Sequence, residues 1–241
     1  MSLTSASTVV SGIKEYAYRG MQQLPIVLAS TSLLFTVTTG SIAHANLFLG
    51  LSVLMPAYTF FLQSVLAFLM PLIFTKGIFW NRSTGDTCDL VAVPSARPIR
   101  LEQFKQDTAT VPSFWMTSVA FFFGYAFSNI VDSINQVPAE NASDVSKERR
   151  SYQTTFIAVN TAVLLALLLF IRLWFMRGCD GLGTGGIVIS LLAALGAGGI
   201  GAGIYKMSKE CGARSTDLFG VLSQMLPESA GTKHPIVCKA E

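Results

Sequence analysis

Few residues of this chain have the types and spacing that catalysis or metal binding needs. Residues Gly181–Gly186 fit the G-x-G-x-x-G pattern of dinucleotide-binding loops, but that pattern holds a pyrophosphate only where a strand delivers it to a soluble helix. Long apolar runs precede and follow it here, so we interpret it as a turn between helices. Cys211, His234 and Cys238 are soft metal ligands, but three ligands with a long gap between the first two make a weak zinc site.

The remaining polar residues do not form a catalytic set. The sequence has two histidines, no H-E-x-x-H and no G-x-S-x-G, so it offers no nucleophile and base that belong together. Asn129, Asp132 and Asn135 recur every three residues on one helical face and would line an ion vestibule in a channel. The same row is typical of a helix end that emerges into water. We expect no enzyme activity, no cofactor and no bound metal.

The composition places these residues in lipid. Of the 241 residues, 51% are hydrophobic and only 13% are charged, and the mean hydropathy is +0.52. A soluble domain carries about 25% charged residues. The net charge of +3 comes from 17 basic and 14 acidic side chains, a balance that does not suit a nucleic-acid surface, so no nucleic-acid partner is expected.

Intervals without formal charge mark the membrane spans, because a charged side chain at mid-bilayer costs at least about 2.5 kcal/mol. They predict an all-α membrane protein with about five transmembrane helices, in segments 24–43, 46–74, 111–131, 153–175 and 186–205. We expect an interfacial amphipathic helix over 1–23, polar loops over 76–110 and 132–152, and a tail over 206–241 with a short surface helix.

The first two spans are expected to form an antiparallel hairpin. We place its tight turn at His44 and Ala45. The second span is longer than the hydrocarbon core requires. Pro56 and Pro71 are its expected kink points, because proline has no N–H and its ring crowds the carbonyl four residues earlier.

The last span has very little side-chain bulk. Gly199 and Gly203 form a G-x-x-x-G pair, and Ala194, Gly198 and Ala202 form a second row of small residues. Close backbone approach drives helix association in lipid, where apolar side chains gain nothing by leaving their solvent. We expect this helix to pack against its own bundle and also against a partner chain; packing within the monomer alone is the alternative.

The five-span layout also constrains the cysteines. It places Cys88 and Cys179 on one side of the membrane, and Cys211 and Cys238 on the other. Only one side can face an oxidising compartment, so at most one disulfide is expected, Cys88–Cys179 or Cys211–Cys238, and four free thiols are an equal alternative. Lys and Arg are almost evenly divided between the two sides, so the orientation stays open.

The segment Cys211–Gly220, CGARSTDLFG, follows the last predicted span and resembles small multi-span membrane proteins encoded by large icosahedral DNA viruses. Proteins of that sort lie in the membrane beneath a capsid, so the resemblance implies a structural role that links lipid to a protein shell. We therefore expect a non-enzymatic structural or assembly subunit in a virion inner membrane, with lipid, other membrane or shell proteins, or further copies of the chain as partners. A small ion channel or transporter is the alternative.

Overall fold

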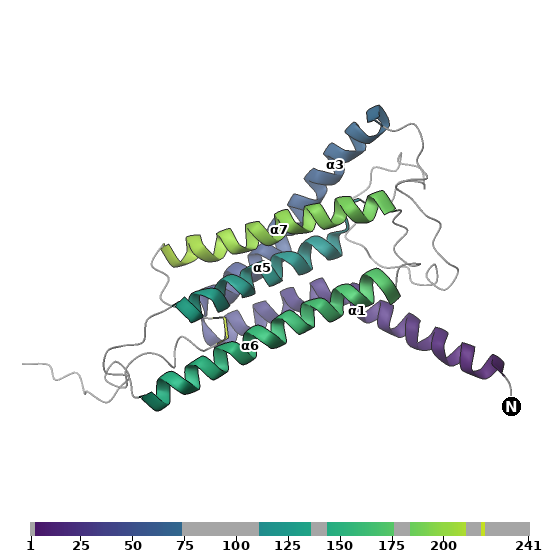
Figure 1. Ribbon diagram of the computed structural model, residues 1–241. Coiled ribbons are helices and arrows are strands. Elements are labelled where there is room, and N and C mark those ends of the chain that lie inside the picture. The colour runs from purple at the N-terminus through teal and green to yellow at the C-terminus, as the bar shows by residue number, and fades with distance from the viewer. Residues whose placement is uncertain (1–2, 74–110, 136–143, 176–183, 211–217, 220–241) are drawn as a thin grey trace, which may run out of the picture.

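A computed structural model of the chain describes residues 3–73, 111–135, 144–175, 184–210 and 218–219 (Figure 1). Every regular element in these ranges is a helix. In chain order they are α1 (Leu3–Thr39), α2 (Ile42–Leu49), the π-helical turn η1 (Gly50–Leu54), α3 (Met55–Ile73), α5 (Phe114–Asn135), α6 (Asp144–Phe170), the π-helical turn η3 (Ile171–Phe175) and α7 (Thr184–Glu210).

The described part of the chain contains 4 helical segments that are long and apolar enough to cross a membrane: Ile42–Leu69, Phe114–Asn135, Ser151–Leu173 and Gly185–Lys209. The remaining expected span corresponds to a shorter apolar segment, Gln23–Thr39, whose length is near the lower limit for a crossing. The prediction of an all-α protein with several membrane spans is confirmed.

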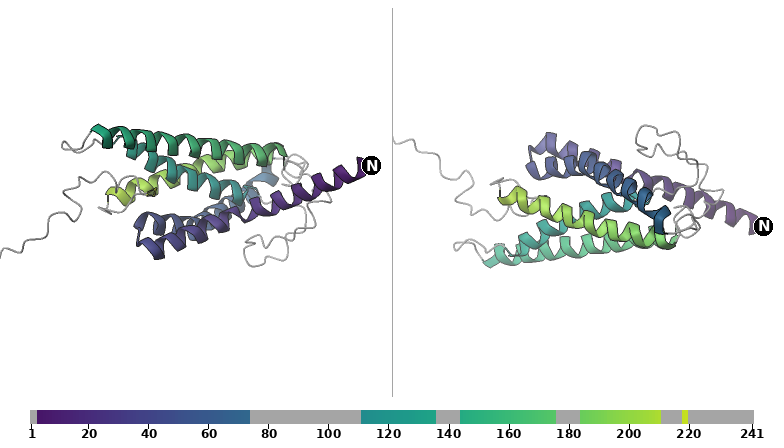
Figure 2. Two further views of the ribbon diagram at one scale, coloured as in Figure 1. Left: turned by 90° about the horizontal axis from the view of Figure 1, so that it is seen from below. Right: turned by 90° about the horizontal axis from the view of Figure 1, so that it is seen from above.

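The N-terminal region is one helix where the sequence suggested two. α1 has 37 residues and runs through Pro25, so it joins the expected amphipathic segment to the first apolar segment. At 1.5 Å per residue it is about 55 Å long, well beyond a hydrocarbon core of about 30 Å. Figures 1 and 2 show its N-terminal end projecting past the neighbouring helices.

The turn of the first hairpin lies earlier than expected. α1 ends at Thr39, and the N–H of Gly40 donates to the carbonyl of Thr36 at 2.9 Å. Gly40 has a φ of +64°, a conformation that glycine adopts without the steric cost of a Cβ. The expected turn at His44 and Ala45 is therefore wrong, because both residues lie inside α2.

The second span is helical throughout but not uniform. The π-helical turn η1 ends two residues before Pro56, and the N–H of Met55 donates to the carbonyl of Gly50. Such turns accompany local bends in helices. Figure 1 shows α3 leaving the direction of α5 and α7. Pro71 lies in the last turn of α3, which ends at Ile73.

α5 is the centre of the bundle and lies between α6 and α7 (Figures 1 and 2). Its side chains enter two buried clusters. The first contains Met21, Trp115, Met116, Val119, Phe123 and Ala194, and the second contains Leu47, Leu51, Met55, Phe121, Tyr125, Ala197 and Tyr205. Opposite faces of the aromatic-rich α5 thus contact α1, α6 and α7 in the first cluster, and α1, α2, α3 and α7 in the second.

Candidate functional site

The helices α5 and α7 approach each other closely enough to bring their backbones into contact. A Cβ placed on Gly124 would lie 2.1 Å from the carbonyl oxygen of Gly198, and one on Gly201 would lie 2.3 Å from the carbonyl oxygen of Phe121. Both contacts are with backbone atoms, which cannot move aside as a flexible side chain can. Only glycine permits this separation, and the two backbones gain dispersion contacts along their length.

The small residues expected to mediate packing divide between two faces of α7. Ala194 is buried, and a Cβ on Gly198 would lie 3.3 Å from the carbonyl oxygen of Ala120 in α5. Ala202 is half-buried. A Cβ added to Gly199 or Gly203, by contrast, would have no atom of the described chain within 4 Å. One row therefore packs within the bundle, and the G-x-x-x-G pair faces outward.

Two of the glycines at this contact were not selected from the sequence. Gly201 lies outside the two rows that the pattern suggested, on the α5-facing side of α7, and Gly124 belongs to the partner helix. A signal for Gly124 was present, because it is the single glycine of α5 and follows three consecutive phenylalanines. In such a helix a residue without a side chain marks a point of close approach.

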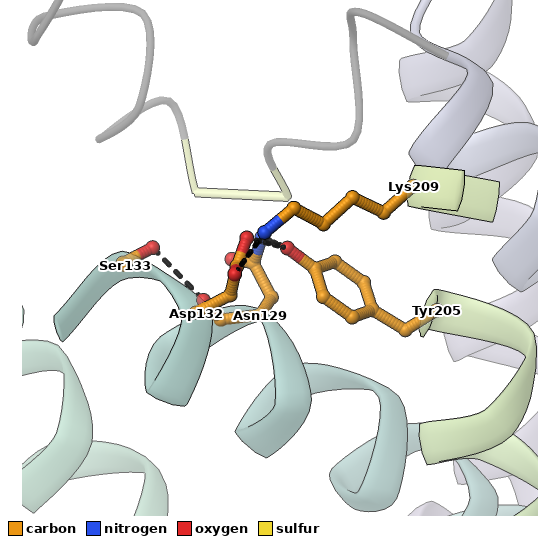
Figure 3. A network of polar contacts seen from close by, with 5 residues as sticks. All are labelled: Asn129, Asp132, Ser133, Tyr205 and Lys209. Carbon is orange, nitrogen blue, oxygen red and sulfur yellow. Dashed lines mark hydrogen bonds and ion pairs between the residues drawn. The ribbon is translucent and has the colours of Figure 1, made fainter. Parts of the chain in front are cut away.

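A polar network joins the ends of α5 and α7 (Figure 3). The amide Nδ2 of Asn129 donates to the hydroxyl of Tyr205 at 3.3 Å, and that hydroxyl donates to Oδ2 of Asp132 at 2.9 Å. Nζ of Lys209 forms an ion pair with Oδ1 of Asp132. Asn129 is fully buried and Tyr205 is 2% exposed, whereas the Lys209 side chain is 46% exposed. The network therefore runs from the bundle interior to its surface.

Two further hydrogen bonds tie this network to the start of α2. The hydroxyl of Tyr125 donates to the carbonyl of Ala43 at 3.1 Å, and its ring lies edge-on to that of Tyr205. The amide of Asn46 donates to Oγ of Ser208 at 2.6 Å. Hydrogen bonds thus join α2, α5 and α7, three helices that are distant in sequence, at one end of the bundle.

The side chains of Asn129, Asp132 and Asn135 do not face a common space. The first two point toward α7, whereas Asn135 is exposed. The carboxylate of Asp132 is compensated by the ammonium of Lys209 and by the tyrosine hydroxyl. Such an arrangement stabilises a helix contact and offers less negative charge to a passing cation than a free carboxylate would.

The opposite end of the bundle has its own polar contact, which involves α1. Pro25 has no N–H to donate to the carbonyl of Met21, four residues earlier in α1. The indole N–H of Trp115 donates to that carbonyl instead, at 2.5 Å. The guanidinium carbon of Arg172, which belongs to η3, lies 5.0 Å from the centre of the same indole ring. Arg172 is 6% exposed, and the aromatic face helps to stabilise its charge.

Near this end of the bundle, further hydrogen bonds connect α3, α7 and the start of α5. The hydroxyls of Thr59 and Thr117 lie 2.9 Å apart, and both side chains are buried. The N–H of Ser113 donates to Oγ of Ser190 at 3.0 Å, and the hydroxyl of Tyr58 donates to the carbonyl of Ala193 at 3.1 Å. Satisfying polar groups between helices is what a bundle in lipid requires.

Several expected features lie outside the described residues. These are all four cysteines, with both disulfide alternatives Cys88–Cys179 and Cys211–Cys238, and also His234, the first three residues of Gly181–Gly186, and nearly all of the tail. Within the described ranges, no cluster of three or more His, Cys, Asp or Glu side chains is placed to hold a metal ion.

Contacts between helices thus occur at three levels along the bundle, in the middle and at both ends. Glycines bring α5 and α7 into backbone contact, and paired polar side chains fix the two ends. Comparison of this chain with protein-family models, with curated proteins and with solved structures found no match.

Proposed function

We propose that this protein is a non-enzymatic structural subunit that assembles side by side with other proteins in a membrane. The observation that carries the proposal is the outward row of α7, where Gly199 and Gly203 meet open space. The residues around them, Val188, Leu192 and Leu195, are apolar and exposed. This surface suits lipid or another membrane helix, and glycine allows that helix to approach closely.

The energetics of glycine support a partner at this row. Glycine costs about 0.8–1 kcal/mol relative to alanine in the interior of a helix. At Gly124 and Gly201 the contact between α5 and α7 requires it, but a Cβ on Gly199 or Gly203 would meet nothing within the described chain. Packing of a second helix against this row would explain why glycine, and not alanine, occurs at these two positions.

The use of the polar side chains favours a structural role over ion conduction. Tyr58, Thr59, Tyr205 and Asp132 all make hydrogen bonds between helices of the bundle. Of the other polar residues in the spans, Ser64 and Asn160 donate to carbonyls of their own helices. A conducting path needs polar groups that face a common lumen, whereas these groups fasten the helices to one another.

The resemblance of the tail to virus-encoded membrane proteins suggests the setting. We place the subunit in the internal membrane of a virus particle, where it would link lipid to a protein shell. The described part of that tail segment, Leu218 and Phe219, includes one residue that packs against the second buried cluster. This contact would hold the tail beside the membrane surface, within reach of a shell protein.

The proposal is tested by enlarging the outward row. We expect the wild-type protein, cross-linked in its native membrane, to yield complexes with a partner of fixed stoichiometry. Gly199→Leu combined with Gly203→Leu removes the close approach and should abolish those complexes while the protein remains in the membrane. Ala57→Leu combined with Ala67→Leu adds similar bulk to exposed positions of α3 and should leave those complexes intact.

Two results would contradict the proposal. One is a protein that stays monomeric in its native membrane without a cross-linked partner. The other is an ion flux through liposomes containing the purified protein that Asp132→Ala abolishes, since that result would identify the network of Figure 3 as part of a conducting path.

A further inference from the structure

α6 has the most exposed surface of the spans in the described structure. The most apolar 18-residue stretch of its segment Ser151–Leu173 has a mean hydropathy of 2.4, yet only 6% of this stretch is buried. In the bundle it packs mainly against α5. Figure 2 shows α6 on the outside of the bundle. Most of its circumference is therefore available to lipid or to another protein.

The carboxamide of Asn160 interrupts this apolar surface at the depth where lipid tolerates a polar group least. Asn160 is exposed, and along the helix it lies about 14 Å from Ser151 and about 20 Å from Leu173. This position is close to the middle of a hydrocarbon core of about 30 Å. An amide placed in hydrocarbon without its full set of hydrogen bonds is unfavourable.

The hydrogen bond that Asn160 makes does not use the whole amide. Its Nδ2 donates to the carbonyl of Phe156 in the same helix at 2.7 Å. This is the one hydrogen bond that the Asn160 side chain makes to the described residues. An asparagine side chain has two N–H donors and a carbonyl oxygen with two acceptor positions. A donor and an acceptor are left for a neighbour.

The exposed residues around Asn160 have the spacing of a helix-pairing seam. Alternating steps of four and three residues connect five exposed side chains: Phe156, Asn160, Val163, Leu167 and Phe170. This 3.5-residue period keeps one stripe in contact with a partner helix as the two supercoil. A single asparagine within such a stripe fixes the register of the pair.

We infer that α6 is a self-association surface, and that a second copy of this chain covers it with Asn160 opposite Asn160. Copies of one chain insert in the same orientation, so two α6 helices related by a two-fold axis along the membrane normal are parallel, and their Asn160 residues lie at equal depth. The amide is self-complementary, because each carboxamide can donate to the other and accept from it. The seam therefore fits its own copy in shape, depth and hydrogen bonding.

This inference goes beyond the proposed function and concerns a different helix. The outward row of α7 is assigned to other proteins, whereas the seam of α6 is assigned to the chain itself. Variants in one helix leave the other unchanged, so either assignment can fail while the other stands.

The strength of the pair is measured by energy transfer between two fluorescently labelled populations in liposomes, as a function of the protein-to-lipid ratio. Asn160→Leu should weaken dimerisation about tenfold, as expected for the loss of a reciprocal pair of hydrogen bonds between membrane helices. The matched control is Ser64→Leu, because Ser64 is also exposed and donates only to a carbonyl of its own helix, Phe60. This control should leave the dimerisation constant unchanged.

The position of the seam is tested by disulfide cross-linking in a variant whose native cysteines are replaced by serine. Val163→Cys should form a dimer on oxidation in liposomes, and Leu195→Cys, which is exposed on α7, should not. The inference is overturned if Leu195→Cys cross-links and Val163→Cys does not, if the protein is monomeric at all protein-to-lipid ratios, or if Asn160→Leu dimerises as well as wild type.

Discussion

Gly124 and Gly198 determine how closely the two central helices pack, and this contact makes a sharp prediction at the residue scale. Gly124→Ala places a Cβ 2.1 Å from a backbone oxygen of α7, so the helices must separate. We expect a loss of about 1–3 kcal/mol in the free energy of unfolding, the range for overpacked sites. Unfolding in mixed micelles, followed by circular dichroism, measures it.

The control for this prediction is Gly203→Ala, where the new Cβ meets no atom of the described chain within 4 Å. Its effect should be close to zero or slightly stabilising, because alanine is the better helix former. Equal losses from the two substitutions would show that the contact between α5 and α7 is not as close as described.

The polar network of Figure 3 makes a second prediction at this scale. Tyr205→Phe removes one hydroxyl that accepts from Asn129 and donates to Asp132. We expect a loss of about 1–3 kcal/mol, because the substitution takes a hydrogen-bond partner from two groups, one of which is fully buried. Tyr152→Phe, at a tyrosine that is 73% exposed, should change stability by less than about 0.5 kcal/mol.

At the residue scale the sequence predicted which helix carries the packing residues but not which face. Period and residue size identify Gly199 and Gly203 as readily as Gly198 and Gly201, because all four are small. The choice depends on how α7 is rotated about its axis, and that rotation is fixed by the fit of Phe121 and Tyr125 from α5. A contact between two helices cannot be deduced from one of them.

At the scale of elements, the proline in α1 and the tryptophan in α5 should depend on each other. Trp115→Phe removes the indole N–H that bonds the carbonyl of Met21, and we expect it to cost about 1–2 kcal/mol. In a Pro25→Ala background residue 25 has an N–H that can bond this carbonyl within α1. The cost of Trp115→Phe should therefore fall by about 0.5–1 kcal/mol, the range of one net hydrogen bond.

A double-mutant cycle isolates this coupling, because the change in ring size and the loss of the contact with Arg172 are common to both backgrounds and cancel. Strictly additive free energies of unfolding for Trp115→Phe and Pro25→Ala would show that the indole does not replace the missing helix bond.

The elements themselves were predictable from sequence, and their ends less so. Charge-free intervals located the spans, because the cost of a charge in lipid is large and local. The hairpin turn was misplaced by a few residues, since Gly40 and the polar residues near His44 both fit a turn. The choice between them was made by where α1 and α2 pack against each other, which is a tertiary effect.

At the scale of the whole molecule, the spans form a bundle centred on α5 that leaves α6 and one face of α7 on the outside. The sequence established the class of protein through composition alone, since 13% charged residues cannot cover a soluble domain. It did not establish which span is peripheral. The apolar part of α6 has hydrophobic residues on all sides, so its sequence is compatible with a buried position and with a lipid-facing one. Only the arrangement of the bundle distinguishes these two positions.

The membrane position of α6 is the central claim, because both proposed surfaces require spans whose outer faces lie in the hydrocarbon core. A spin label on Leu164→Cys, an exposed position beside the α6 seam, and one on Glu148→Cys, exposed near the start of the same helix, are compared in liposomes of the cysteine-free protein. We predict that dissolved oxygen relaxes the Leu164 label strongly and that a water-soluble nickel chelate relaxes only the Glu148 label. A Leu164 label that is as accessible to the nickel chelate as the Glu148 label would contradict the claim.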